Sequence, residues 1–401
     1  MAIKSDEILA KASSMFARHS YERITLEQIA SQLDMVPSAL YHYFRDKKEL
    51  IFQCYLRGLN IYSQELEAAS EPGIDGLEII RRFLRGRLSP DSPRMILFTD
   101  IDALPEKFCQ IVHESRWKNV EKLAAIVQQG VEDGSVESNE PLLTSVALIS
   151  ILDWVPFWFS EHDYYTHQQA IDSIDDIVTH GVCRRDLKAS VSPPLPDLSP
   201  FLEAQAGLSK RLSKFDQLLR IASDNFNRKG AMGASLEQIA LDAGMTRSGI
   251  YYHFDSKEDL LYACLTRSLK REAEIAAHVA AQWARTSDYV IQINRLLLML
   301  HDTPCGPKET YHNINYLAQN HRNAYVSEVL SIVDAVQERF KNSIRLGEFR
   351  GVDGYFAHRI MSGMEHWYPV WFRKCTRWPP VAVADHFSNM FLYGIKPRSI
   401  L

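Results

Sequence analysis

The sequence predicts an all-α protein that contains two similar units in one chain. The pentapeptide at residues 26–30, LEQIA, recurs letter for letter at residues 236–240. A second block, WVPFWF at residues 154–159, returns as WYPVWF at residues 367–372. Elsewhere apolar residues recur mostly at i, i+3, i+4 and i+7, the period of an amphipathic helix. We therefore expect a helical unit of roughly 200 residues that occurs twice.

Composition agrees with two folded units. The chain has 401 residues and is 46% hydrophobic, which is enough for two or more cores. Its formal net charge of -5 argues against a protein that coats nucleic acid or anionic membrane along its whole surface. Any contact with a polyanion must therefore be local.

The six cysteines are widely scattered, without a CxxC pair or a histidine at zinc-ligand spacing. We interpret them as reduced thiols. Cys54 and Cys264 are equivalent positions on apolar helix faces, where core packing is favoured over a redox role. The N-terminus lacks the pattern of a signal peptide, and the most apolar stretch, residues 148–159, is shorter than the ~20 residues of a membrane span. We expect a soluble, cytoplasmic protein.

The first helix of each unit is predicted by an apolar stripe that ends at Phe16 in one copy and at Phe226 in the other. Thr25 then opens a second helix, with Gln28 three residues later to complete a capping box. Ser235 and Gln238 repeat this arrangement in the second copy.

A tight turn follows, with Asp34 in the first copy and Gly244 in the second, and a third helix carries Tyr41 or Tyr251. Two short helices joined by a tight turn predict a helix-turn-helix motif.

This segment resembles the N-terminal DNA-binding domain of the TetR family of bacterial transcriptional regulators. The resemblance rests on the order LEQIA, turn, (L/I)-Tyr-x-x-Phe and a lysine-containing segment that ends at Leu50 or Leu260. It covers about 50 residues of each half. The first copy departs from the family pattern at its turn, where Asp34, Val36 and Pro37 replace Gly244, Thr246 and Arg247.

The resemblance implies three small helices for DNA, followed by a larger helical body that binds a small molecule and dimerises through its last two helices. Helical patterns at residues 106–131 and 322–346, and late helices ending at Gly181 and Gly394, supply such a body. Family members are usually homodimers whose recognition helices lie about 34 Å apart. Here both subunits share one polypeptide, so we expect an intramolecular pseudo-dimer, and further pairing of chains stays open.

A proline-rich stretch separates the two units, because residues 190–200 hold four prolines and no helical period. The expected boundaries are two helix-turn-helix domains, two ligand-binding and dimerisation domains, and the linker. The helix-turn-helix domains are expected at residues 1–50 and 210–260, the ligand-binding and dimerisation domains at residues 51–184 and 261–401, and the linker at residues 185–209.

Candidate DNA contacts follow from the motif positions. The resemblance implies a phosphate clamp at the lysines that begin the fourth helix, and backbone contacts from the tyrosines of the third helix. The next exposed position can reach base edges or the thymine methyl group. A tyrosine ring can pack in the domain while its hydroxyl group contacts phosphate. For the lysines, the alternative is a solvated surface charge. Phe44 and Phe254 are expected in the core. The candidates are Thr25, Ser38, Tyr41, His42, Lys47, Ser235, Thr246, Arg247, Ser248, Tyr251, Tyr252 and Lys257.

The two recognition helices differ in sequence, since Val36 and Pro37 stand opposite Thr246 and Arg247. A homodimer reads a palindrome because its two readers are identical. This chain can read two different half-sites, so we hypothesise an imperfect or asymmetric inverted repeat as its operator.

An effector pocket needs an apolar and aromatic lining with some polar groups, and each body has its own set. For any single member, helix packing is the alternative. We expect a hydrophobic or amphipathic ligand, such as an acyl-CoA thioester, an aromatic acid or a steroid-like molecule, and one body alone can suffice to bind it. Trp154 and Trp367 are assigned to the dimer interface instead. The candidates are Phe83, Phe98, His113, Trp117, Tyr311, Tyr316, His321 and Tyr325.

Enzyme functions find little support. No nucleophile elbow, phosphate loop or paired zinc motif occurs, so no cofactor is expected. His162, Asp163 and His167 could suggest a metal site, but two histidines five residues apart do not share a helix face. The sequence therefore predicts a ligand-responsive DNA-binding regulator, most simply a repressor. The alternative is a DNA-binding or protein-interaction module that lacks an effector and is controlled by partner proteins.

Overall fold

The computed structural model describes residues 2–18, 24–159, 165–186, 192–202, 214–301, 303, 306–372 and 377–398. Within these ranges the regular structure is helical, apart from one isolated bridge between Cys183 and Phe349. The all-α prediction is confirmed. His162, Asp163, Cys305 and Cys375 lie outside the described residues.

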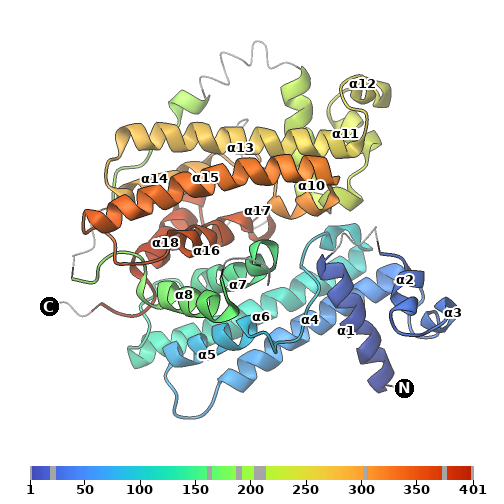
Figure 1. Ribbon diagram of the computed structural model, residues 1–401, viewed down its shortest axis with the longest axis horizontal. Helices are drawn as coiled ribbons and strands as arrows, with labels where there is room; N and C mark the ends of the chain where they lie inside the picture. The colour runs from blue at the N-terminus through green and yellow to red at the C-terminus, as the bar shows by residue number, and fades with distance from the viewer. Residues whose placement is uncertain are drawn as a thin grey trace.

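The first unit occupies one side of the molecule and the second unit the other (Figure 1). The helices of the first unit are α1 (Ala2–Arg18), α2 (Leu26–Ser31), α3 (Pro37–Leu40), α4 (Lys47–Ala69), α5 (Gly76–Leu88), η1 (Ile101–Ala103), α6 (Glu106–Asp133), α7 (Pro141–Trp158) and α8 (His167–His180). Those of the second unit are α10 (Lys214–Gly233), α11 (Leu236–Asp242), α12 (Arg247–Tyr251), α13 (Lys257–Gln282), α14 (Thr286–Met299), η2 (Tyr311–Tyr316), α15 (Gln319–Arg345), α16 (Gly354–His366), α17 (Tyr368–Trp371) and α18 (Pro380–Tyr393).

The helix starts follow local signals in the sequence. Thr25 caps α2 with a complete capping box, since its hydroxyl accepts from the Gln28 amide at 3.2 Å and its own amide donates to Gln28 Oε1 at 2.8 Å. The capping box predicted for α11 is only half formed, because one of its two hydrogen bonds is absent. Ser235 accepts from the Gln238 amide, but the Gln238 side chain donates to Asp242 Oδ1 instead of returning to the cap.

The turn of the helix-turn-helix has one geometry in both copies. Gly244 has φ 63° and Asp34 has φ 52°, so both lie in the left-handed region. Asp is among the few residues other than glycine that adopt this region at modest cost. The departure of the first copy from the glycine pattern therefore leaves the turn unchanged.

At one contact between the units, α7 and α8 of the first unit each pack against α16 and α18 of the second. By length and composition alone α7 could cross a membrane, and it is longer than the apolar stretch expected from sequence. Most of α7 is buried inside the molecule, and Trp154 stacks on His366 of the second unit at 4.4 Å. Its apolar character thus serves the contact between units. Trp154 lies in this interface, as predicted.

A local two-fold pseudo-symmetry relates the chain segments around Gly181 and Gly394. The amides of Val182 and Cys183 donate to the carbonyls of Phe391 and Leu392, at 3.1 and 2.8 Å. At the equivalent place in the second copy, the amides of Ile395 and Lys396 donate to the carbonyls of Val178 and Thr179, both at 3.0 Å. The two glycines have φ 69° and 76°, and each leaves no room for a Cβ against the other's backbone. The duplicated ends of the two units therefore bind each other reciprocally.

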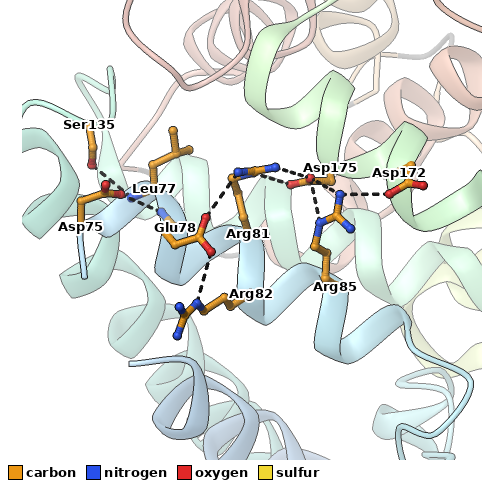
Figure 2. Close-up of polar contacts among 9 residues, drawn as sticks. All are labelled: Asp75, Leu77, Glu78, Arg81, Arg82, Arg85, Ser135, Asp172 and Asp175. Atoms are coloured by element: carbon orange, nitrogen blue, oxygen red, sulfur yellow. Dashed lines mark hydrogen bonds and ion pairs between the residues drawn. The ribbon is translucent and has the colours of Figure 1, made fainter. Parts of the chain in front are cut away.

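An ion-pair network fixes α8, a helix of this interface, to α5 of the first body (Figure 2). Asp175 is 2% exposed and accepts hydrogen bonds from Arg81, at 2.8 and 2.9 Å, and from Arg85 at 2.9 Å. Arg85 also reaches Asp172 at 3.0 Å, and Arg81 contacts Glu78 at 3.3 Å. The buried carboxylate of Asp175 therefore ties α8 to α5 through two arginines.

The described part of the linker is attached to the second unit. Arg295 on α14 donates to the carbonyl of Pro193 at 2.7 Å and to Ser192 Oγ at 2.8 Å. Its guanidinium also pairs with Asp385 on α18. Gln292 donates to the carbonyl of Pro194 at 2.7 Å. The extended proline segment is therefore part of the folded structure of the second unit.

Candidate nucleic-acid interface

Each unit presents one recognition helix, α3 or α12, and both lie at the same end of the molecule (Figure 1). Residues 31–40 and 241–250 have the same pattern of buried and exposed positions, residue by residue. Leu40 and Ile250 anchor the two helices in the cores of their domains. The two heads, defined as α1–α3 and α10–α12, therefore offer the same scaffold with different exposed side chains.

The residues predicted to contact bases, His42 and Tyr252, and the tyrosines predicted to contact the DNA backbone, Tyr41 and Tyr251, are on the surface. Tyr252 is 85% exposed, Tyr41 55% and Tyr251 43%, and His42 is also exposed. Phe44 and Phe254 are buried, so the prediction that they are core residues is confirmed. The other exposed candidates are Thr25, Ser38, Thr246, Arg247 and Ser248, while Ser235, Lys47 and Lys257 are half-buried.

Some of these groups already have local partners. Thr246 caps α12, because its hydroxyl accepts from the Gly249 amide at 3.1 Å. Lys47 and Lys257 are the first residues of α4 and α13, as predicted. Lys257 Nζ lies 3.3 Å from the Ala234 carbonyl and 5.0 Å from the ring centre of Tyr316. A cation at the first turn of a helix can meet a phosphate together with free backbone amides.

Charge distinguishes the two heads. Arg247 forms an ion pair with Glu237 of α11 and donates to the Tyr251 hydroxyl at 3.2 Å. The Ser235 hydroxyl, together with this arginine, holds the pKa of Glu237 below its usual value. In the first head Pro37 stands at the arginine position, so it supplies no guanidinium to pair with Glu27. The second recognition helix thus carries a cation at its entering end that the first lacks.

The heads also differ in how the bodies hold them. The second head is packed against the first body, because α10 contacts η1. At this contact Gly230 has φ 67°, and a Cβ there would lie 1.6 Å from Asp100 Oδ1. Helix α1 of the first head packs mainly against α4 and α2 of its own unit. Sequence reasoning missed this cross-unit contact, since it depends on how the two units dock.

The aromatic set of the first body is distributed over two environments. Phe83 and Phe98 are buried and pack around Tyr62, with ring centres 6.0 and 6.2 Å away. His113 is more exposed and lies 2.8 Å from Asp102. Together with Phe98 it lines a small cavity against α10. Trp117 is half-buried against the core.

The set of the second body is likewise divided. Tyr311 and Tyr325 are neighbours, 5.9 Å between ring centres, and Tyr311 also meets Trp154 of the first unit at 5.2 Å. His321 stacks on Tyr262 at 4.3 Å, near the start of α13, and Tyr316 lies over Lys257. Sequence reasoning grouped these residues by order along the chain, whereas the helices place them in separate surroundings.

The chain matches two family models, each of them twice. The model described as bacterial regulatory proteins of the tetR family matches residues 8–54 and 218–264. The model described as the tetracyclin repressor-like C-terminal domain matches residues 78–182 and 306–395. Each half of the chain thus carries both domains in the same order.

Curated relatives align with about one unit. The transcriptional repressor BepR of Brucella suis is 25% identical over 181 residues, which cover 45% of this chain and 81% of BepR. The uncharacterised regulator YhgD of Bacillus subtilis is 22% identical over 156 residues, 37% of this chain and 82% of YhgD.

The solved structures that match this chain also align with about one unit. The TetR family regulator PfmR from Thermus thermophilus is 26% identical, with a TM-score of 0.38, and covers 42% of this chain and 95% of its own. AibR, in complex with isovaleryl coenzyme A and operator DNA, is 18% identical, with a TM-score of 0.39, and covers 43% of this chain and 96% of its own.

Proposed function

The chain belongs to the TetR family of bacterial regulatory proteins, and on this premise we propose that it is a repressor which binds one imperfect inverted-repeat operator through two unlike heads. As a family member it is a DNA-binding transcriptional regulator and not an enzyme. The proposal rests on one observation above others: two recognition helices at the same end of a single chain carry different exposed residues on equivalent scaffolds.

The roles of these residues are those that the family resemblance implies for their motif positions. Lys47 and Lys257 neutralise phosphates at the first turns of α4 and α13, and Tyr41 and Tyr251 contact the backbone with their hydroxyl groups. The side chains that face the major groove are those of Ser38, His42, Thr246, Arg247, Ser248 and Tyr252. Thr25 and Ser235 add contacts at the starts of α2 and α11. Binding releases counterions, with a slope of log affinity against log salt of about −0.9 for each phosphate neutralised.

Footprinting combined with half-site exchange tests the operator proposal. The native site is compared with two perfect palindromes, each built from one of its half-sites. We expect both palindromes to bind more weakly than the native site, because each presents one head with the wrong bases. Equal affinity for all three duplexes would contradict unlike heads.

We further propose that a hydrophobic or amphipathic small molecule in one helical body releases the operator. Binding couples to release when the molecule has different affinities for the two arrangements of the heads. Because the heads belong to one chain, occupancy of one body suffices. A titration in which release needs two equivalents per chain would contradict this point.

A regulator without an effector, controlled by partner proteins, is the second candidate. It is favoured by the small size of the cavities of the second unit, which have volumes of about 20 to 80 Å³. A thermal-shift screen with operator binding as the second readout separates the two. A molecule that stabilises the protein and weakens operator binding supports the effector, whereas stabilisation without any change in operator affinity supports the alternative.

A further inference from the structure

Three cavities that share lining residues lie in the second unit beside residues 306–310, where the C-terminal end of α14 meets α16 and α17 in the first cavity, α10 and α17 in the second, and α13 in the third. Their volumes are about 20, 80 and 40 Å³, room for one or a few water molecules each. His301 lines all three, and Pro307, Lys308 and Tyr368 each line two. Side chains of the loop at residues 306–310 and of α17 therefore separate the three cavities from one another.

The cavity wall holds a carboxylate oxygen without a partner. Glu365, on α16, lines the first cavity beside Leu297 and Leu298. Its Oε1 atom is buried and accepts no hydrogen bond from the described residues. Burial raises the pKa of Glu365 to about 7. A buried carboxylate of this kind is costly unless a donor or a cation pairs with it.

The neighbouring cation is already engaged. Lys308 Nζ lies 2.7 Å from Glu272 Oε1, so its charge is balanced by that carboxylate. Glu309, 1% exposed in the same wall, has a pKa raised well above its usual value by burial. Lys308 is thus paired with Glu272, and the Oε1 atom of Glu365 is left without a hydrogen-bond donor among the described residues.

The interior of the first unit contains a buried ion pair. Arg116 and Asp153, 3% and 7% exposed, form an ion pair at 3.0 Å, and the Tyr62 hydroxyl donates to Asp153 at 2.7 Å. In the register that aligns Trp154 with Trp367, the second unit has Val329 and His366 in place of this pair. The second unit therefore lacks this buried ion pair.

We infer that these cavities form the effector site, one per chain, and that it takes an apolar molecule carrying one protonated amine. The amine pairs with Glu365, and the apolar part displaces the side chains between the cavities along Leu297 and Tyr368. The inference rests on the proposed function, because it names the effector class of the regulator described above.

The loop that lines these cavities is tied to the second head. Asn227 of α10 donates to the Lys308 carbonyl at 2.5 Å, and its Oδ1 atom accepts from the Thr310 amide at 2.9 Å. Asn313, just beyond the loop, accepts from the Ala231 amide of α10 at 2.9 Å. The residue equivalent to Asn227 in the first head is Ala17. A ligand that displaces the loop must therefore shift α10, and the second head with it.

Three probes of equal chain length test the ligand class: n-octylamine, octan-1-ol and octanoate, titrated calorimetrically into the full chain at pH 8. We expect one molecule of amine per chain, bound about 10-fold or more tightly than the alcohol, because a charge-assisted hydrogen bond contributes that much. Octanoate should bind no better than the alcohol. Glu365→Gln should bring the amine down to the affinity of the alcohol, while the control Glu338→Gln, an exposed glutamate on α15, should change nothing.

Equal affinity for amine and alcohol, two sites per chain, or an unaltered amine preference in Glu365→Gln would overturn the inference. The melting temperature of each variant confirms that it is folded. The same titrations with operator DNA present separate this inference from the proposed function. If the amine binds as expected but does not release the operator, the binding site is supported and its regulatory role is refuted. If another class of molecule releases the operator and the protein shows no preference for the amine, the proposed function is supported and this site is refuted.

Discussion

At the scale of single residues, the difference between the heads is concentrated in a few exposed positions. Arg247 is held by Glu237 and Tyr251 before DNA binds, which orients its guanidinium at the entering end of α12. Pro37, at the first turn of α3, offers an apolar surface at the corresponding place. Arginine reads guanine with two hydrogen bonds, whereas apolar groups contact the thymine methyl.

Arg247→Ala should weaken operator binding by about 1 to 3 kcal/mol and relax base preference in one half-site. Pro37→Ala is the matched control in the other head, and it should cost less because no charged contact is lost. Selection from random duplexes followed by sequencing measures both effects. An unchanged base preference in the Arg247→Ala selection would show that this arginine contacts phosphate alone.

Gly181→Ala should lower the free energy of unfolding by at least about 3 kcal/mol, because the new Cβ meets backbone atoms across the interface in addition to the strain of a positive φ. Gly134→Ala is the control. It has φ 78° but open space around it, so it should cost about 1 kcal/mol. Urea denaturation measures both, and equal losses would mean that the glycine contact contributes nothing.

The sequence could predict residues whose role depends on their near neighbours. Thr25 with Gln28, the left-handed turn position, and the exposure of Tyr252 all follow from spacing along the chain. Arg116 and Asp153 could not be paired in this way, because they lie on different helices and are brought together only by packing. For the same reason Glu365 was not singled out.

At the scale of helices, the interface between units contains a titratable contact. His386 on α18 lies with its Nε2 atom 2.9 Å from the Thr144 hydroxyl on α7. Burial lowers the pKa of His386 to about 4 from its ordinary 6.5. The neutral ring is therefore favoured in the folded protein, and its contribution to stability is complete above pH 6.5 and lost as the pH falls toward 4.

Between pH 6.5 and 4.5 the wild type should lose stability relative to His386→Gln, since the amide can hold the Thr144 hydroxyl without titrating. The difference in free energy of unfolding between the two proteins, measured by denaturation across that pH range, reports this group and cancels the titration shared by both. A difference that does not vary with pH would refute the assignment.

The loop at residues 306–310 connects the cavities to α10 through Asn227. Asn227 also lines one of the cavities, so Asn227→Ala should lower amine affinity somewhat, and it should reduce the effect of the amine on operator affinity by a larger factor. Calorimetry and operator titration in the presence of the amine measure the two properties separately. Full operator release in Asn227→Ala would show that the signal passes by another route.

Helix identity was predictable where capping and periodicity are strong, as in α2, α6 and α15. The break between α16 and α17 was harder to predict. Trp367 and Trp154 are equivalent in sequence, but α7 continues past Pro156 while the second copy stops at His366 and restarts as α17. A proline removes one amide donor in either case, so the surrounding packing decides whether the helix continues.

At the scale of the whole molecule, duplication within one chain changes what each half can do. A homodimer must keep both heads and both pockets alike, because one gene segment encodes them. In this chain the interface backbone kept its two-fold pattern, with equivalent hydrogen bonds after Gly181 and after Gly394, while recognition helices and interiors diverged. The repeat could be predicted from sequence, whereas the buried ion pair of the first body and the cavities of the second required the packed structure.

The central claim is that one chain is the complete DNA-reading unit. Native mass spectrometry of the protein bound to its selected operator tests it most directly. We predict a complex with one 46.0 kDa chain per duplex, which loses binding when either half-site is scrambled. A complex that requires two chains per duplex, or full binding to a single half-site, would contradict the account.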